Sequence, residues 1–338
     1  MSLLKKIYVP EGYKDTLDLR TTDKAIKYVK DNFENIFARH LNLERITAPL
    51  FVTEQSGLND NLNGVERPVA FDIPDANSFV QVVHSLAKWK RLALKRYGFN
   101  VGEGIYTDMN AIRRDEELDN LHSVYVDQWD WEKVISEKDR NLEYLSNIAS
   151  AIFSALYETQ SLVCEKFKTL VPYIKRDFVT VTTEELLNLY PNLTPKEREN
   201  EICKKYGSVL IAQIGKTLSD GTKHDGRAPD YDDWELNGDI LVWYEPLNRA
   251  IELSSMGIRV NPESMKRQLK LANCEQRSSL EFHKALLAGE LPLTVGGGIG
   301  QSRLCMIMLN KIHIGQVQAS VWGDEITEEC KKERIVLL

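Results

Sequence analysis

The chain has 338 residues, 43% of them hydrophobic, which is enough apolar material for a large buried core. Its 50 acidic and 43 basic residues give a net charge of −7. No run of Lys and Arg could neutralise many phosphates, so we expect no nucleic-acid partner. The apolar stretches fall short of the roughly 20 residues of a membrane helix, and the N-terminus lacks the apolar region of a signal peptide. We therefore expect a cytoplasmic protein with no membrane partner.

The first predicted element is an amphipathic helix that Thr22 and Asp23 can cap. Its apolar positions recur at three- and four-residue spacing: Ile26, Val29, Phe33 and Phe37. The next apolar segment, residues 46–52, suits an edge or interface strand, because Pro49 cannot donate a hydrogen bond to a sheet.

A hairpin and a second helix are expected before residue 100. Residues 67–73 and 78–83 flank the turn sequence PDAN and predict the hairpin. Residues 84–98 predict a helix that ends at Gly98.

Two more strands follow, joined by a charged loop at residues 113–121. Strand alternation sorts the second of them into two faces. One face carries Val124, Val126, Gln128, Asp130 and Glu132, and the other carries Tyr125, Asp127, Trp129 and Trp131. The first face therefore holds polar groups for which a sheet alone gives no reason.

The rest of the chain predicts a long helix and several strands. Residues 139–168 form the longest helical pattern, and the capping-box sequence TTEE at 182–185 opens a further helix after the strand DFVTV. Three more strands are expected at residues 208–214, 238–243 and 249–255. Short turns join several strands, so the sheet is expected to be largely antiparallel. We predict a single α+β domain over residues 1–338.

Two acidic residues, Asp239 and Glu252, lie on the last two predicted strands. If both carboxylates face one cleft, they repel each other and the pKa of one rises, unless a divalent cation neutralises the pair. Mg²⁺ is the natural candidate, because it binds one or two carboxylates together with nucleotide phosphates. The alternative is that both residues are solvated strand ends.

Three arginines could act with that acid pair: Arg113, Arg259 and Arg303. Each offers a planar fork for a carboxylate or phosphate, although a single arginine is more often a surface residue. Arg303 follows the stretch TVGGGIG, whose G-x-G-x-G spacing fits neither a P-loop nor a dinucleotide-binding turn.

The polar segment 220–234 is either an ordinary surface loop or a loop that folds over a ligand.

Several of these segments resemble the class II aminoacyl-tRNA synthetases, in the aspartyl and asparaginyl branch. GGGIGQSRLCM resembles their motif 3, AIRRDEELDNLHSVYVDQWDWE their motif 2, and ITAPLF their motif 1. The resemblance implies an α+β catalytic domain with a mostly antiparallel sheet flanked by helices, on which ATP binds in a bent form. It also implies a homodimer, with Arg113 as the α-phosphate ligand and Arg303 as the γ-phosphate ligand.

The stretch from about residue 22 to 322 is still more similar to the ammonia-dependent asparagine synthetases, or aspartate-ammonia ligases, of bacteria. Six motifs match in order: HSLAKWKR, HSVYVDQWDWE, APDYDDW, LNGDILVW, ELSSMGIRV and GGGIGQSR. Residues 1–20 then form an N-terminal extension. The chain departs from the tRNA synthetases because it has no anticodon-binding barrel before the catalytic domain, and because Ser302 stands where an acidic residue is usual.

The resemblance implies a reaction in two steps. ATP and the side-chain carboxylate of L-aspartate form β-aspartyl-adenylate and pyrophosphate, and ammonia then attacks the activated carbonyl to give L-asparagine and AMP. Adenylation is needed because a free carboxylate is a poor acyl electrophile, whereas an acyl phosphate has a good leaving group. Mg²⁺, held by Asp239 and Glu252, would help Arg113 to offset the charge on the α-phosphate.

The amino-acid pocket follows from the same resemblance. Lys90 and Arg259 would grip the α-carboxylate of aspartate, since the side-chain carboxylate is the one that reacts. Asp130, Asp232 and Ser255 would form the rest of the pocket, with the two acids facing the α-ammonium group.

The reacting carbonyl and the adenosine would have their own neighbours. Asp60 would receive ammonium or take a proton, and Gln128 together with Arg113 would polarise the acyl oxygen. Adenosine would be surrounded by Ser123, Val126 and Ser254.

Two other functions stay open on the sequence. The chain could form an adenylate and pass it to tRNA or to a protein lysine, but the missing RNA-binding module weighs against that. It could instead be a regulator that kept the fold and binds an amino acid as a signal. A regulator that had lost catalysis would not need the four residues expected to bind ATP and Mg²⁺, and the chain retains all of them: Arg113, Asp239, Glu252 and Arg303.

Overall fold

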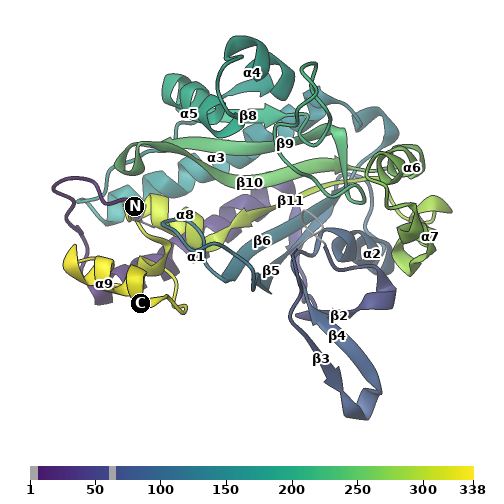
Figure 1. The fold of residues 1–338 in the computed structure, drawn as a ribbon, viewed down its shortest axis with the longest axis horizontal. Helices are drawn as coiled ribbons and strands as arrows, with labels where there is room; N and C mark the ends of the chain where they lie inside the picture. Colours follow the sequence, from purple (N-terminus) through teal and green to yellow (C-terminus); the bar gives the residue numbers. More distant parts are fainter. Residues whose placement is uncertain (1–6, 61–65) are drawn as a thin grey trace.

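An eight-stranded sheet forms the centre of the computed structural model, which describes residues 7–60 and 66–338 (Figure 1). Its strands lie in the order β1-β5-β6-β11-β10-β9-β8-β7. Their bounds are β1 Leu43–Arg45, β5 Gly104–Ile112, β6 Tyr125–Val134, β11 Thr294–Gly300, β10 Arg249–Arg259, β9 Asp232–Tyr244, β8 Ser208–Ala212 and β7 Val179–Thr182. The inner neighbours pair antiparallel, and the edge pairs β1–β5 and β7–β8 are parallel. The prediction of a largely antiparallel sheet in an α+β fold is confirmed.

Helices cover one face of this sheet fully and the other face in part. Three helices pack on the covered face: α1 (Leu19–Leu41), α3 (Leu142–Lys166) and α8 (Gln301–Met308). On the opposite face α2 (Ala87–Tyr97) packs against β5 and β6, and α5 (Pro195–Tyr206) packs against β8, β9 and β10. The remaining helices lie at the margins: α4 Thr183–Leu189, α6 Pro262–Leu271, α7 Glu281–Leu287 and α9 Asp324–Lys332.

A second sheet of three strands, in the order β2-β4-β3, projects from the body of the molecule (Figure 1). Its strands are β2 Phe51–Thr53, β3 Ala70–Ile73 and β4 Ser78–Val82. The pairing of β3 with β4 confirms the predicted hairpin. The strand expected over residues 46–52 is wrong for most of its length, because residues 46–50 lie between β1 and β2 and Pro49 belongs to neither strand.

The helices predicted over residues 84–98 and 139–168 are present, but each begins three residues later, α2 at Ala87 and α3 at Leu142. Asp18, not Thr22, caps α1, because its side chain accepts a hydrogen bond from a backbone N–H of the first turn. Thr22 lies buried inside that turn. The helix α2 ends at Gly98 with a left-handed φ of 75°, and Thr182 and Glu185 form the predicted capping box of α4.

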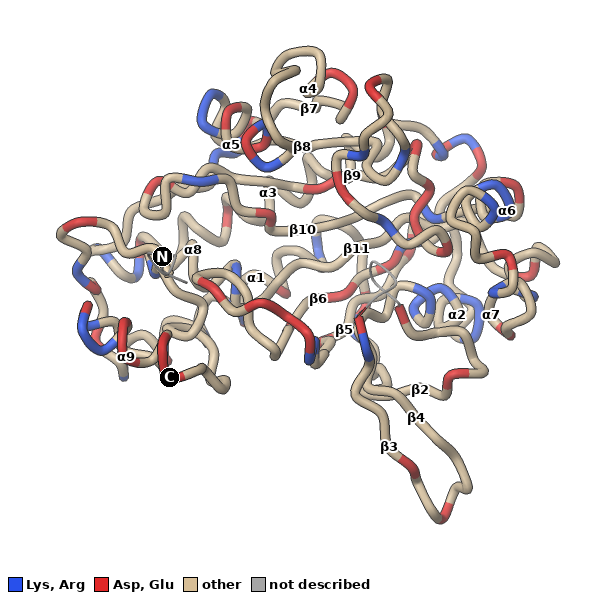
Figure 2. Tube along the Cα trace, in the orientation of Figure 1, with Lys and Arg blue, Asp and Glu red and all other residues tan. Residues whose placement is uncertain are grey.

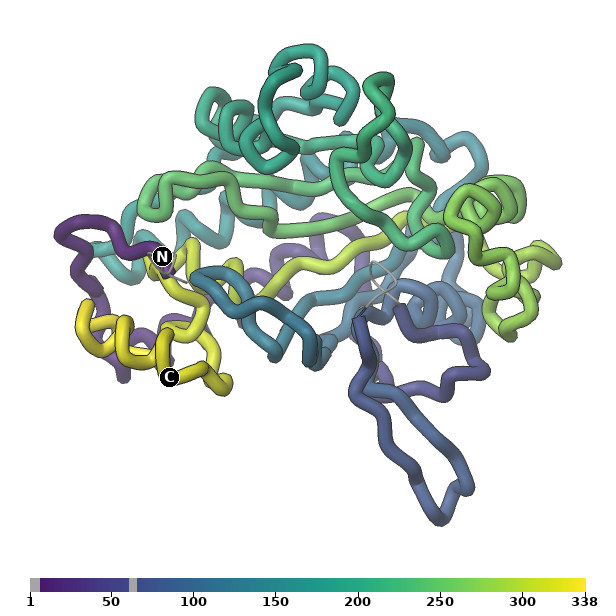
Figure 3. The backbone as a smooth tube through the Cα atoms, viewed as in Figure 1, coloured from purple at the N-terminus to yellow at the C-terminus, as the bar shows by residue number. Residues whose placement is uncertain are grey.

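Only part of the N-terminal extension expected over residues 1–20 lies in the described part of the chain, since residues 1–6 are outside it. Figure 3 shows this segment beside the C-terminal end of the chain. Lys311 Nζ lies 2.5 Å from Asp15 Oδ1, and the backbone N of Tyr8 donates to Asn120 Oδ1 at 2.7 Å. The segment is therefore fastened to the core by polar contacts.

The strand β11 lies between β6 and β10 and carries the glycines singled out in the sequence. Gly296 pairs with Glu132 and Gly298 pairs with Asp130 on β6. A Cβ atom at Gly296 would overlap the Glu132 carboxylate, and one at Gly298 would collide with the side chain of Gln128. These glycines are not a phosphate cradle: they leave room for the polar side chains of β6 to lie across β11.

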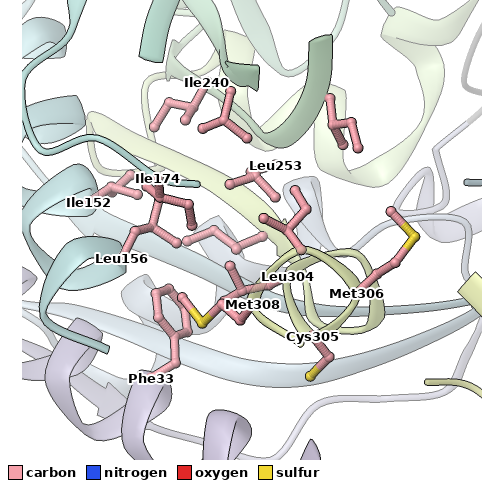
Figure 4. Close-up of a cluster of buried hydrophobic side chains, with 14 of the residues drawn as sticks. Phe33, Ile152, Leu156, Ile174, Ile240, Leu253, Leu304, Cys305, Met306 and Met308 are labelled. Atoms are coloured by element: carbon pink, nitrogen blue, oxygen red, sulfur yellow. The ribbon is translucent and has the colours of Figure 1, made fainter. Parts of the chain in front are cut away.

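The main core lies between the sheet and the helices α1, α3 and α8 (Figure 4). Phe33 is fully buried, with its ring centroid 5.4 Å from that of Phe37 and 4.8 Å from that of Trp129. Figure 4 shows Phe33 near Leu304 and Met308 of α8. Trp129 and Trp131 belong to this core, so their face of β6 is the core face.

We expect Phe33→Ala to lower the free energy of unfolding by about 3–5 kcal/mol, because it removes a buried ring and leaves a cavity. Urea denaturation followed by circular dichroism would measure the loss. Leu271→Ala is the control, since this side chain is 65% exposed and its removal should change little. An equal, small effect of both changes would contradict the assignment of Phe33 to the core.

We expect Gly296→Ala to lower the free energy of unfolding by about 1–3 kcal/mol, as overpacking of a tight interior does. The added methyl group must displace the Glu132 carboxylate, which is fully buried. Gly323→Ala is the matched control, because a Cβ atom there meets open space. Thermal unfolding of the two variants would compare them, and equal midpoints would refute the role given to Gly296.

Candidate active site

A cavity of about 370 Å³ opens on the face of the sheet that α2 and α5 leave uncovered. All but two of the residues predicted for the site line it: Asp60, Lys90, Arg113, Ser123, Val126, Gln128, Asp130, Asp232, Glu252, Ser255, Arg259 and Arg303. The volume falls in the range of about 300–1,000 Å³ that small-molecule sites have. The two exceptions are Asp239 and Ser254.

A β-bulge in β10 explains why Ser254 is outside the cavity. The pairing register with β9 shifts between Glu252 and Ser254, so one extra residue lies in β10 at this point. Because of the shift, Glu252 and Ser255 share the cavity face. Ser254 instead pairs with the core residue Ile240 and is 2% exposed. Ser254 is therefore not on the cavity wall, and its expected place beside adenosine stays a prediction.

One group of charged side chains is built around Glu132, which is fully buried. Arg259 grips it with two nitrogens, Nε at 2.9 Å from Oε1 and Nη2 at 2.7 Å from Oε2. Arg259 Nη1 donates to Asp232 from the other side. Lys90 Nζ lies 3.3 Å from Asp130 Oδ2 and donates to the carbonyl oxygen of Gly297 at 3.0 Å. Acids and bases therefore alternate across this part of the site. Figure 2 shows the Lys and Arg positions along α2, which contributes Lys90.

The charges of this group depend on one another. Burial raises the pKa of Glu132, but Arg259 and Lys90 outweigh it and hold the pKa below its usual value. Burial lowers the pKa of Lys90, although Asp130 and Glu132 oppose that effect. Burial also raises the pKa of Asp232, in spite of the neighbouring Arg259. The cluster can therefore bind a ligand that carries both a positive and a negative charge.

A second group lies around Glu252. Burial raises the pKa of this carboxyl, but nearby cations outweigh it and hold the pKa low, with Arg303 first, then Arg227, and Arg113 also contributing. Arg303 Nη1 donates to the backbone oxygen of Glu252 at 2.9 Å. Arg113 Nη1 lies 3.7 Å from Glu116 Oε2. Several guanidinium groups on one cavity wall suit an anion with several negative charges.

Asp239 lies behind Arg227 and not on the cavity wall. Arg227 Nη2 donates to both oxygens of the Asp239 carboxylate. Burial raises the pKa of Asp239 to about 7, with Glu252 contributing to the rise and Arg227 opposing it. The two acids predicted as a pair are therefore close enough to interact, with a guanidinium group between Asp239 and the cavity.

Sequence reasoning did not single out Arg227 or Glu132, which pair with Asp239 and Arg259 of the predicted site. Arg227 belongs to the polar loop 220–234, for which a ligand-covering role was one alternative, and residues 225–228 and 231–232 of that loop line the cavity. Glu132 was on the polar face of β6, but its neighbours Gln128 and Asp130 gave no reason to separate it from them. Both residues act on other side chains, which the chain order does not reveal.

Mg²⁺ would find a fitting donor set at Asp239 and Glu252. Within residues 7–60 and 66–338 there is no cluster of three or more His, Cys, Asp or Glu side chains that could hold a metal by itself. Mg²⁺ does not need one, because it takes one or two carboxylates and completes its shell with water and phosphate oxygens. The Arg227 guanidinium against Asp239 shows that this carboxylate accepts a cation.

Among the described helices, none is both long enough and apolar enough to cross a membrane.

Comparison with known proteins gives the same family over nearly the whole chain. A model of the aspartate-ammonia ligase family matches residues 20–334. The aspartate-ammonia ligase of Ruminiclostridium cellulolyticum is 57% identical over 336 residues, which are 99% of this chain and 100% of that protein. The one of Clostridium tetani is also 57% identical, over 99% of this chain and 98% of that protein.

Solved structures agree at the level of the fold. An asparaginyl-tRNA synthetase of Pyrococcus horikoshii, in complex with asparaginyl-adenylate, is similar with a TM-score of 0.67 at 14% identity. The match covers 90% of this chain and 71% of the synthetase. The fold is that of the class II aminoacyl-tRNA synthetases, and the chain belongs to the aspartate-ammonia ligase family.

Proposed function

We propose that the protein converts L-aspartate, ammonia and ATP to L-asparagine, AMP and pyrophosphate through β-aspartyl-adenylate. The observation that carries this proposal is a single cavity with two charge groups, one of mixed sign around Glu132 and one rich in guanidinium groups around Glu252. The first suits a zwitterionic amino acid and the second suits a triphosphate. Membership of the ligase family supports the same reaction.

Aspartate would bind in the group around Glu132. Lys90 and Arg259 are the cations for its α-carboxylate, and Asp130 and Asp232 are the anions for its α-ammonium group. Ser255 lies on the same wall and can donate a hydrogen bond. Held in this way, the side-chain carboxylate points away from the cations that bind the α-carboxylate and is free to react.

The first step would join that carboxylate to the nucleotide. A carboxylate oxygen attacks the α-phosphorus, a P–O bond forms, and pyrophosphate leaves. Arg113 would stabilise the charge on the α-phosphate and Arg303 would hold the γ-phosphate. Mg²⁺, when bound by Asp239 and Glu252, would neutralise phosphate charge. Ser123 and Val126 would lie beside adenosine.

The second step would use ammonia as the nucleophile. Its nitrogen attacks the acyl carbon, the bond from that carbon to the phosphate oxygen breaks, and AMP leaves. Asp60 is 2% exposed and lines the cavity, so it can take the proton that the nitrogen loses. Gln128 together with Arg113 would polarise the acyl oxygen.

We further infer that the whole chain acts as one catalytic unit in a cytoplasmic homodimer. ATP and aspartate are cytoplasmic metabolites, which supports the location. The resemblance places the dimer interface at the segment around Pro49. Four large apolar side chains on or next to the three-stranded sheet are exposed: Leu50 52%, Phe51 38%, Phe71 40% and Phe79 58%. A second copy that covers them would account for this surface.

A product assay tests the reaction. The purified protein with Mg-ATP, aspartate and ammonium should release AMP, pyrophosphate and asparagine in equal amounts. Replacing ammonium with hydroxylamine should give the aspartyl hydroxamate, because it attacks the same acyl carbon. Release of ADP, or transfer to added tRNA in place of ammonia, would overturn the proposal.

We expect Arg113→Ala to reduce pyrophosphate formation by about 10²–10³-fold, the usual effect of removing one preorganised charge-stabilising group. The fold should be unchanged, which circular dichroism would show. Arg39→Ala is the control and should leave the rate unchanged. Arg39 is an exposed residue paired with Glu158, and it is not among the residues that line the cavity. Wild-type turnover of the Arg113 variant would remove this residue from the mechanism.

A further inference from the structure

Arg227 stands between the cavity and one of the two carboxylates proposed to hold Mg²⁺. Its side chain is 12% exposed and lines the cavity, whereas the Asp239 side chain is 8% exposed and does not. A single nitrogen, Nη2, donates to both carboxylate oxygens. In this arrangement the cation that neutralises Asp239 is supplied by the chain itself.

A guanidinium group and a metal ion compete for such a carboxylate. Mg²⁺ binds oxygen at about 2.0–2.1 Å and requires a nearly octahedral shell. Both oxygens of Asp239 already accept from Arg227, and the other acid, Glu252, interacts with the same guanidinium group. Mg²⁺ therefore cannot reach Asp239 from the cavity until Arg227 moves away.

The loop that carries Arg227 is anchored on both sides of this residue. The Arg227 side chain can therefore move while the backbone of the loop stays in place. On one side His224 Nε2 lies 3.1 Å from Glu199 Oε1 of α5. On the other side Asp230 is buried and lies 3.3 Å from Lys88 Nζ of α2. Between these anchors, Arg227 Nη1 has only a donor contact to Gly226 O among the described residues, at 3.1 Å. We expect the side chain to leave Asp239 by rotation, without movement of the anchored ends of the loop.

A triphosphate in the cavity offers Arg227 a replacement partner. Guanidinium groups bind phosphate oxygens in the same bidentate manner as carboxylates. If Arg227 turns from Asp239 to a phosphate, the carboxylate becomes free at the moment when Mg²⁺ arrives with the nucleotide. No buried charge is left without a partner in either state, which matters because an unpaired buried charge is costly.

We propose that Arg227 is the counter-ion of Asp239 in the nucleotide-free enzyme and exchanges this carboxylate for a nucleotide phosphate when Mg-ATP binds. The inference rests on the proposed function, since it takes Asp239 and Glu252 as the Mg²⁺ ligands. Its consequence is a coupling between the two ligands. The free enzyme rejects divalent metal ions, and the nucleotide makes the metal site available.

Metal binding without nucleotide tests the exchange independently of catalysis. Mn²⁺ serves as the probe, and its free concentration is read from the electron paramagnetic resonance signal during titration. The wild type should bind Mn²⁺ weakly. Arg227→Gln should bind one Mn²⁺ at least about tenfold more tightly, within the usual range of coupling between sites. Adding Asp239→Asn to that variant should abolish the gain.

Arg267→Gln is the matched control, because Arg267 is exposed and 3.6 Å from a different acid, Asp233. It should bind Mn²⁺ as the wild type does. Arg227→Lys keeps a positive charge that can still pair with Asp239, so it should give a smaller gain, and it serves if the Gln variant does not fold.

Tight binding of Mn²⁺ by the nucleotide-free wild type would overturn the inference, and so would unchanged binding by both Arg227 variants. Neither result would touch the reaction itself. Failure of the wild type to release AMP from aspartate, ATP and ammonium would instead refute the proposed function.

Discussion

The architecture of the site depends on the buried carboxylates of β6 being matched by cations from other elements. Asp130 is matched by Lys90 of α2, and Glu132 by Arg259 of β10. Removing one partner of a buried pair typically costs about 3–5 kcal/mol, because the remaining charge stays in a medium of low dielectric constant. The relative placement of α2, β6 and β10 is therefore set by charge as well as by apolar packing.

The same constraint divides the cavity into two chemical environments. Around Glu132 acids and bases are interleaved, so the environment is bipolar. Around Glu252 the guanidinium groups of Arg113, Arg227 and Arg303 act together on one carboxyl. The two environments share the walls built by β6, β10 and β11, so a small zwitterion and a polyanion can meet at their boundary. An acyl-activating reaction requires that meeting.

Much of this could be read from the sequence, and the reasons are physical. The period of two in a strand placed Val126, Gln128 and Asp130 together on the cavity side of β6, although Tyr125 and Asp127 of the other face also line the cavity. Capping chemistry predicted the start of α4. The glycine spacing correctly excluded a P-loop. The roles of individual residues came from the resemblance to a family and not from composition or spacing.

What the sequence did not reveal comes from features that have no local signature. The bulge in β10 adds one residue and turns Ser254 away, and nothing in ELSSMGIRV marks it. The partner of Asp239 is Arg227, twelve residues earlier on a loop, and only the folded chain brings them together. The purpose of Gly296 likewise requires the pairing of β11 with β6. Sequence patterns describe one element at a time, whereas these features arise between elements.

The bare strand β11 also restricts how this enzyme can be altered. Its glycines contribute backbone and no side chains to the cavity floor, and the carbonyl of Gly297 is a direct partner of Lys90. A carbonyl group is identical for every amino acid, so its chemistry cannot be tuned by mutation. Engineering of a new substrate range must therefore start from the walls of the cavity, at β6 and the Arg227 loop, and leave its floor as it is.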